Sequence, residues 1–261
     1  MKRITADLHI HTALSPCAHQ EMTPPAIVQA AIRKGLDIIA ISDHNSASNG
    51  LPTQQAAGER LAVLAGMEIT TAEEVHVLGI FPDAAAACAC GEVVRATLPD
   101  RLRKRDRHRI GQKHAESEPV PFSQPVRQNL LDSTGRVIGT EGKLLSAATT
   151  LTLESAVELI QAHGGLAIAA HVDRPSFSVM SQLGLFPAEA GFDAIEVYGY
   201  AGKPTDWAQW ESLGLPIVSS SDSHFLDDIG TRYTCFELEI PTFEELQSAI
   251  MEGRGGPARR A

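Results

Sequence analysis

Strand-length apolar runs recur along this chain and alternate with stretches of helical pattern. The runs are apolar on both faces, as strands of a parallel sheet covered by helices are. Expected strands lie at residues 4–10, 36–41, 61–64, 75–81, 166–170, 194–197 and 217–218. Expected helices, each closing at a glycine, lie at about 23–34, 153–163 and 243–252. Seven such strands predict a closed or nearly closed α/β barrel.

The middle of the chain departs from this pattern. Residues 82–149 follow the fourth expected strand and lack a clean hydrophobic period. We therefore expect a long insertion there, either a lid or a small protruding subdomain. Residues 1–252 are otherwise predicted to form a single domain. The tail 253–261, rich in Gly and Arg, is predicted to be disordered.

Composition excludes several classes of protein. No apolar run approaches the roughly 18 residues that span a bilayer, which excludes an integral membrane protein, and the N-terminus turns polar too soon for a signal peptide. The four cysteines are scattered and form no disulfide framework, so we expect a cytoplasmic protein. The formal net charge of −10 argues against tight non-specific binding to long nucleic acid.

Histidines are concentrated where the expected strands end. Six of the ten lie there, together with Glu68 and Asp222: His9, His11, His44, His76, His171 and His224. His9 and His11 are two residues apart in a strand, so both imidazoles face the same side. In a parallel barrel the C-terminal strand ends share one face, where such folds keep their active sites. The sequence therefore predicts a metal site for Zn, Mn or Fe, without dividing the ligands among ions.

At this point the chain resembles the PHP (polymerase and histidinol phosphatase) domain family. The motifs that carry the resemblance are Asp7-Leu8-His9-Ile10-His11-Thr12, Ser42-Asp43-His44, the Glu68/His76 pair, Ala170-His171 and Ser221-Asp222-Ser223-His224. The resemblance implies a distorted, TIM-like (β/α)7 barrel with a trinuclear metal centre. It assigns the first ion to His9, His11, Glu68 and Asp222. It assigns a second ion to Glu68, His76 and His171, and a third to His44 and His224.

The third ion usually takes one more ligand in this family, an Asp or His a few residues after the first motif. Neither residue type follows Ser15 directly in this chain. Cys17 is the best positional match, and a thiolate is a good Zn ligand. His19 is the alternative. A second departure is Asn45, where many members that act on small nucleotides carry Asp.

The activity that the resemblance implies is hydrolysis of a phosphomonoester or nucleotide phosphate by a metal-bridging hydroxide. Two or three divalent ions outweigh the charges of Glu68 and Asp222, which favours a dianionic group. Glu68 and Asp222 are the predicted catalytic residues, with Arg174 as a candidate phosphate clamp. The expected partner is a small phosphorylated metabolite or nucleotide. The alternatives are a 5′–3′ exonuclease on short oligonucleotides, a non-catalytic metal-binding accessory domain and a C–N hydrolase.

Several further residues have two interpretations. Asp7 and Asp43 either orient neighbouring ligands or cap strand ends. Arg232 is a weaker candidate than Arg174 for a phosphate contact, and Glu196 is expected to support the barrel rather than bind metal. The basic run 101–109 either guides an oligonucleotide or forms a solvated helix face, and no aromatic residue within it is available to stack bases.

Overall fold

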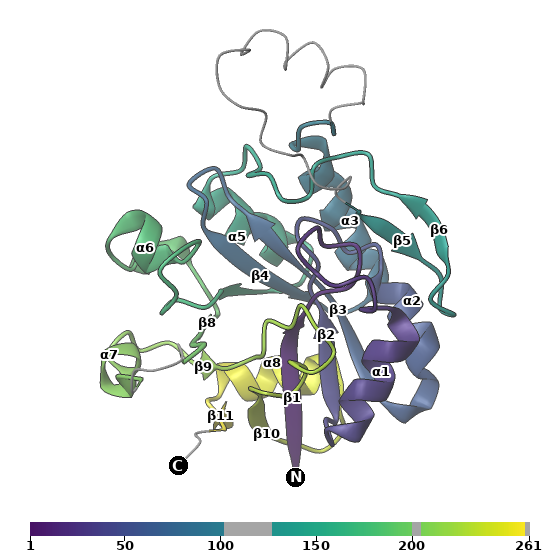
Figure 1. Cartoon of the computed structure of the whole chain (residues 1–261). Coiled ribbons are helices and arrows are strands. Elements are labelled where there is room, and N and C mark those ends of the chain that lie inside the picture. Colours follow the sequence, from purple (N-terminus) through teal and green to yellow (C-terminus); the bar gives the residue numbers. More distant parts are fainter. Residues whose placement is uncertain (102–126, 200–204, 259–261) are drawn as a thin grey trace, which may run out of the picture.

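The computed structural model describes residues 1–101, 127–199 and 205–258. Within them, one nine-stranded sheet dominates the fold (Figure 1). Its strand order is β11 (Gly255–Pro257), β10 (Thr234–Leu238), β1 (Lys2–Ile10), β2 (Ile38–Ile41), β3 (Ala62–Thr70), β4 (His76–Phe81), β7 (Leu166–Ala169), β8 (Ala194–Glu196) and β9 (Ile217–Val218). The chain after β9 returns to β1, where Ser223 pairs with Ile10. The sheet is therefore a nearly closed barrel, and the expected α/β barrel is confirmed.

The sequence pattern predicted parallel strands throughout, but not all strands of the sheet are parallel. The runs β1–β2–β3 and β7–β8–β9 are parallel, but β4 is antiparallel to both β3 and β7. Only residues 71–75 connect β3 to β4, and a parallel connection needs a crossover of a dozen or more residues. β10 and β11 also pair antiparallel, next to β1.

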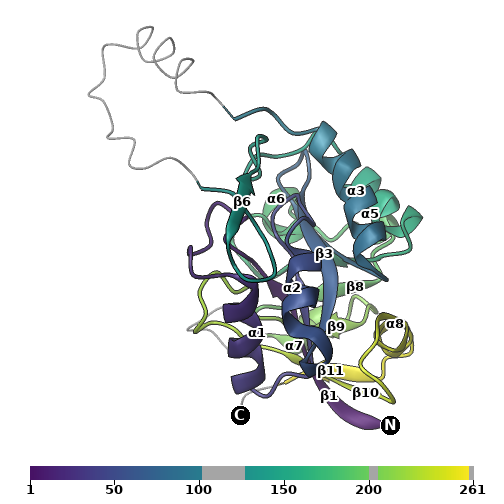
Figure 2. The same ribbon diagram turned by 90° about the vertical axis from the view of Figure 1, so that its right-hand side faces the viewer.

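Helices cover the outside of the barrel. α1 and α2 lie side by side over β2 and β3, while α3 and α5 lie together over β3, β4 and β7 (Figure 2). Their bounds, with those of the remaining helices, are α1 Pro24–Arg33, α2 Gly50–Ala57, α3 Ala84–Ala96, α5 Leu153–Ala162, α6 Val179–Leu183, α7 Trp207–Glu211 and α8 Phe243–Met251. The described residues also contain two short 3-10 helices, Gly58–Arg60 and Ala188–Ala190. None of the helices in the described ranges could cross a bilayer.

Local chemistry explains these helices. In α5 the Thr152 hydroxyl accepts a hydrogen bond from the Ser155 N–H, which satisfies one of the free donors at the helix start. One face of the helix then packs into the core through Leu153, Ala156, Val157 and Ile160. α1 begins with Pro24 and Pro25, whose fixed φ suits a first helical turn.

The segment expected to be an insertion begins with a helix of the barrel layer. Ala87, Cys90 and Val94 of α3 belong to the main core, so the departure from the barrel starts after Ala96 rather than at Pro82. A hairpin of β5 (Asn129–Leu131) and β6 (Val137–Thr140) follows further along. The basic run lies outside the described residues, except for Arg101.

The expected disordered tail is wrong for its first half. Gly255–Pro257 forms β11, because the backbone of these residues pairs with β10 and Arg254 donates a hydrogen bond to the Glu237 carbonyl. Composition favours disorder only where no sheet edge is available for pairing.

Candidate metal centre

The strand ends bring the predicted ligands to one rim of the barrel. His9 belongs to β1 and Glu68 to β3, while His171 and Asp222 lie just beyond β7 and β9. All four are buried. His76 reaches the same rim for a reason that the sequence pattern did not reveal. It is the first residue of β4, and because β4 runs antiparallel, its start lies where the parallel strands end.

Glu68 lies at the centre of this cluster. Its Oε1 is 2.7 Å from His76 Nδ1, 3.1 Å from His171 Nε2 and 3.3 Å from His9 Nε2. Its Oε2 is 2.8 Å from His44 Nδ1 and 3.5 Å from His11 Nε2. One fully buried carboxylate therefore contacts five imidazoles. Such a carboxylate could hold a metal ion together with these imidazoles.

Asp222 contacts two of the same histidines, His9 and His11. Its Oδ1 is 3.1 Å from His11 Nε2 and 3.6 Å from His9 Nε2. Its Oδ2 is 2.5 Å from Nη1 of Arg174, which is the predicted phosphate clamp. The guanidinium is thus at the edge of the cluster and only partly buried.

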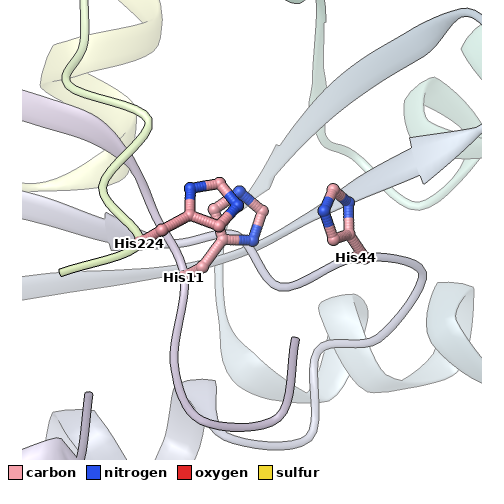
Figure 3. Close-up of side chains that lie close together, drawn as sticks. All are labelled: His11, His44 and His224. Atoms are coloured by element: carbon pink, nitrogen blue, oxygen red, sulfur yellow. The ribbon is translucent and has the colours of Figure 1, made fainter. Parts of the chain in front are cut away.

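Cys17 completes a third group of candidate ligands. Its Sγ lies 3.2 Å from His44 Nε2 and 3.1 Å from His224 Nε2. Figure 3 shows His44 and His224 together with His11, brought from three separate segments of the chain. His19, the alternative ligand, does not join them: its Nδ1 is 3.5 Å from Glu21, and its ring is half exposed.

Hydrogen bonding fixes which nitrogen of His9 faces the cluster. Its Nδ1 is 3.0 Å from Oε2 of Glu196, a carboxylate that can only accept. Nδ1 therefore carries the proton, and in the neutral ring Nε2 presents a lone pair to Glu68 and Asp222. Glu196 also accepts the backbone N–H of His171. Glu196 thus supports the barrel as expected, and in addition it orients a candidate ligand.

His11 is oriented by a relay that the sequence reasoning missed. The Ser15 hydroxyl donates to Asp43 Oδ1 and accepts the backbone N–H of His44. Its remaining role toward His11 Nδ1, 3.0 Å away, is that of acceptor. His11 Nε2 then also presents a lone pair to the cluster. Asp43 accepts from Thr12 as well, so it both orients a ligand and closes the strand end.

The donor set fits metal ions. In the neutral rings the Nε2 lone pairs of His9 and His11 face carboxylate oxygens, and a cation held between them would stabilise this arrangement. Several buried polar atoms of the cluster find no hydrogen-bond partner among the described residues: His9 Nε2, His44 Nδ1, Glu68 Oε2, His76 Nδ1 and His171 Nδ1. The candidate ligands form three overlapping groups, and within each group the ligand atoms lie within 4.8 Å of one another: His11/His44/His224, His9/His11/Glu68 and His44/Glu68/His76.

The electrostatics agree with this reading. Burial would raise the pKa of Glu68, but His76, His9 and His44 outweigh it and hold the pKa well below its usual range. Burial opposes charge on His9, yet Glu196, Asp222 and Glu68 raise its pKa well above the usual value. Without metal, a proton would therefore occupy the place that the carboxylates offer to a cation. Burial, with His224 and His44, holds the pKa of His11 well below its usual range.

The thiol of Cys17 is activated in the same environment. Burial would raise its pKa, but hydrogen bonds from His224 and His44 outweigh burial and lower the pKa to about 6. A thiolate is the form of cysteine that binds metal.

Backbone strain is concentrated around the cluster. Among the described residues, five non-glycine residues have positive φ, and four of them belong to the cluster or adjoin it: Asn45 (51°), His171 (30°), Phe177 (57°) and Asp222 (48°). Such conformations cost about 1–3 kcal/mol each and persist where surrounding contacts impose them. Asn45 itself does not face the ions, because its amide bonds to the backbone of Thr70, Leu145 and Ala147.

Two arginines flank a tyrosine beside Asp222. The guanidinium carbon of Arg174 lies 4.2 Å from the centroid of the Tyr198 ring, and that of Arg232 lies 3.9 Å from it. Arg232 also donates to the carbonyl of Gly199. Asp7 holds the segment that carries Asp222 in place, since it accepts hydrogen bonds from Ser221 and from the Gly230 N–H.

Tyr198 and Ser15 were not predicted from the sequence. Neither residue occurs in a strand-end histidine motif, and their roles depend on contacts across the barrel. Glu196, by contrast, was singled out in the sequence as an acid on an expected strand, although its contact with His9 was not predicted.

A sequence model described as the PHP domain matches residues 7–158, and one described as PHP-associated matches residues 208–254. The chain is 25% identical over 254 residues to the 5′–3′ exoribonuclease Rnm of Escherichia coli (strain K12), covering 84% of each chain.

Two solved structures share the fold. The lesion-specific endonuclease PfuEndoQ of Pyrococcus furiosus matches 98% of this chain with a TM-score of 0.66 and 22% identity, and this chain spans 57% of that enzyme. A putative metal-dependent phosphoesterase of Bifidobacterium adolescentis matches 84% of this chain and 87% of its own length, with a TM-score of 0.57 and 19% identity.

Proposed function

The chain belongs to the PHP family, whose members hydrolyse phosphoester bonds, and we propose that it is a metal-dependent phosphoesterase acting on a nucleotide or another small phosphate ester. The observation that carries this proposal is the buried cluster of imidazole lone pairs and carboxylates beside an arginine. Lone pairs that face carboxylates hold cations, and the guanidinium at the edge suits an anionic substrate group.

The ligand sets follow from shared contacts. His9, His11, Asp222 and Glu68 would hold one ion, and Glu68 with His76 and His171 a second. Cys17, His44 and His224 would hold a third, in which the thiolate favours zinc, while the other sites suit Zn, Mn or Fe. Bound divalent ions supply Lewis-acid polarisation of a phosphate and lower the pKa of a water molecule.

The chain's own residues prepare this chemistry. Glu196 keeps the proton of His9 on Nδ1, and the Ser15–Asp43 relay keeps the proton of His11 on Nδ1, so both Nε2 atoms remain available as ligands. Arg174 binds a non-bridging phosphate oxygen. Its contact with Asp222 aims the guanidinium at the cluster before substrate arrives.

Phosphate release tests this function. Chelated protein would be reconstituted with Mn or Zn and assayed on sugar phosphates, 5′- and 3′-nucleotides and short oligonucleotides, with metal content measured in parallel. We expect metal-dependent turnover that Asp222→Asn abolishes and that Asp227→Asn, at an exposed acid five residues away, leaves intact. No turnover by protein that holds metal would contradict the proposal, and failure to hold metal would favour a non-catalytic accessory domain.

A second candidate function is 5′–3′ hydrolysis of short oligonucleotides. It is supported by the relative Rnm, whose name states that activity and whose chain matches this one over most of its length. The assay that separates the two follows the mononucleotides and the inorganic phosphate released from a 5′-phosphorylated oligonucleotide, by chromatography. Release of 5′-terminal mononucleotides would favour the exonuclease, and release of inorganic phosphate alone would favour the phosphomonoesterase.

A further inference from the structure

Two phenylalanines are exposed beside the metal centre. Of the phenylalanines within the described residues, only Phe177 and Phe225 expose a large part of the side chain, 42% and 52% respectively. Aromatic residues make up only 5% of the chain, so two open rings near one site are unusual for it. Solvent exposure of a large apolar ring next to a reactive centre calls for a ligand-binding explanation.

Phe177 is held over the cluster by both its ring and its backbone. Its ring stacks on that of His76, with centroids 4.8 Å apart and planes 19° apart. Its carbonyl accepts the backbone N–H of His76 at 2.9 Å. No other ring contact of Phe177 is found in the described part of the chain. One face of the ring therefore covers a candidate ligand, while the residue as a whole stays 42% exposed.

The backbone at Phe177 is forced into this position. Its φ of 57° is rare for a bulky side chain, which has to be held there by its surroundings. Directly after it, the Ser178 hydroxyl donates to the Arg174 carbonyl at 2.7 Å and caps α6. Arg174 and Phe177 are thus fixed in one short loop, in which the first contacts Asp222 and the second covers His76.

Phe225 lies on another side of the centre. It directly follows His224, which contacts Cys17. Its ring stacks on His19, with centroids 5.6 Å apart and planes 29° apart. The backbone N–H of His19 donates to the His224 carbonyl, so the pair is tied to the segment that carries this candidate ligand. His19, which does not join the cluster, thus has a role in supporting an exposed ring.

Tyr198 differs from these two rings. Arg174 and Arg232 already lie over it, which leaves its cation-binding surface occupied. Phe177 and Phe225 have no cationic partner over the ring among the described residues. Flat aromatic rings with an open face are the surfaces on which nucleic-acid bases stack, whatever the base.

We propose that Phe177 and Phe225 are stacking platforms for two bases, one on each side of the phosphate held at the metal centre. This inference rests on the proposed phosphoesterase function and specifies its substrate as a single-stranded oligonucleotide of at least two nucleotides. The two bases are bound by stacking rather than by base-edge hydrogen bonds, so the site accepts any sequence.

The test compares substrates that differ by one base. A phosphorylated dinucleotide would be assayed beside two matched dinucleotides, each with one base replaced by an abasic sugar. The proteins are the metal-loaded full chain and its variants Phe177→Leu, Phe225→Leu and Phe177→Trp. Leu185→Ala serves as the control, since Leu185 is exposed, apolar and not aromatic.

We expect each leucine variant to lower kcat/KM on the intact dinucleotide by about 5- to 150-fold, as loss of one base–aromatic stack does. Each leucine variant should also hydrolyse one of the two abasic dinucleotides as well as the intact one, and the abasic position should differ between the two variants. Phe177→Trp should retain activity. Equal losses on intact and abasic substrates would assign the rings a structural role and overturn the inference, as would no loss at all. If the metal-loaded wild-type chain hydrolyses a mononucleotide or a sugar phosphate but none of the three dinucleotides, the inference fails alone. If it hydrolyses none of these compounds, the proposed function fails with it. If the wild type hydrolyses all three equally well, only the stacking inference fails.

Discussion

Replacing Glu196 tests how the barrel prepares the metal centre. Its Oε2 accepts hydrogen bonds from His9 Nδ1 and from the His171 backbone N–H, both at 3.0 Å and both buried. In Glu196→Ala both donors lose their partner, and the proton of His9 is no longer kept on Nδ1. His9 then populates the tautomer whose Nε2 carries a proton and cannot bind an ion.

The size of the effect follows from these two contacts. Loss of a partner that orients a metal-binding histidine costs about 10- to 100-fold in metal affinity. This corresponds to about 1.4–2.7 kcal/mol of binding free energy. Glu196→Gln should lie at the low end, about tenfold, because the amide oxygen can still accept both hydrogen bonds while the charge is lost.

A competition titration against a chromophoric zinc chelator, at one fixed pH, measures this affinity. Glu189→Ala, at an exposed acid, is the control and should bind as the wild type does. Circular dichroism establishes that each variant is folded. A folded Glu196→Ala that binds zinc as tightly as the wild type would refute the reasoning, since His9 would then need no partner to be oriented.

Three further predictions concern other parts of the molecule. Cys17, with its pKa of about 6, should be alkylated by iodoacetamide at pH 7 before Cys88, whose pKa is raised by burial. Zinc should protect only Cys17 from alkylation. Peptide mass spectrometry measures the alkylation rates of both cysteines. Burial would raise the pKa of Glu141, but the hydrogen bond from Arg95 outweighs burial and lowers this pKa from its ordinary value of 4.5. The Arg95–Glu141 pair therefore stabilises the fold above pH 4.5, and this stabilisation is lost as the pH falls through the lowered pKa. Denaturation of Glu141→Gln should therefore show a weaker loss of stability on acidification than the wild type, and an identical pH profile would count against the pair. Gly66→Ala places a Cβ 2.7 Å from the Gly79 carbonyl oxygen and should lower the free energy of unfolding by about 1–3 kcal/mol. The control Gly142→Ala, whose added Cβ would meet no atom within 4 Å, should leave this free energy unchanged. Urea denaturation measures both, and equal midpoints would show that the sheet shifts to accommodate the Cβ of the Gly66→Ala variant.

Much of the centre could be predicted from single strand ends. His9 and His11 alternate along one strand, and His171 and Asp222 each follow an apolar run, so local pattern places them at the rim. His76 was found near its strand, but the reason for its position was missed. The antiparallel direction of β4 depends on the short β3–β4 connection and on pairing with β7, which no local periodicity encodes.

The pairing of the tail and the start of the insertion also could not be predicted from local sequence pattern. Gly255–Pro257 has the composition of a disordered end, yet the exposed edge of β10 pairs with it. α3 lacks a clear helical period because much of its buried face is small, through Ala87 and Gly91, although the face packs in the core.

By itself, the sequence determined the kind of barrel, the set of candidate ligands and the family, because these depend on residue types at short spacing. Only the tertiary structure decided the rest: which nitrogen of His9 and of His11 faces the cluster, that Cys17 rather than His19 contacts His44 and His224, and that two phenylalanines remain exposed beside the centre. The partners that make these choices, such as Glu196 for His9, are separated by up to about two hundred residues along the chain and meet only when the barrel closes.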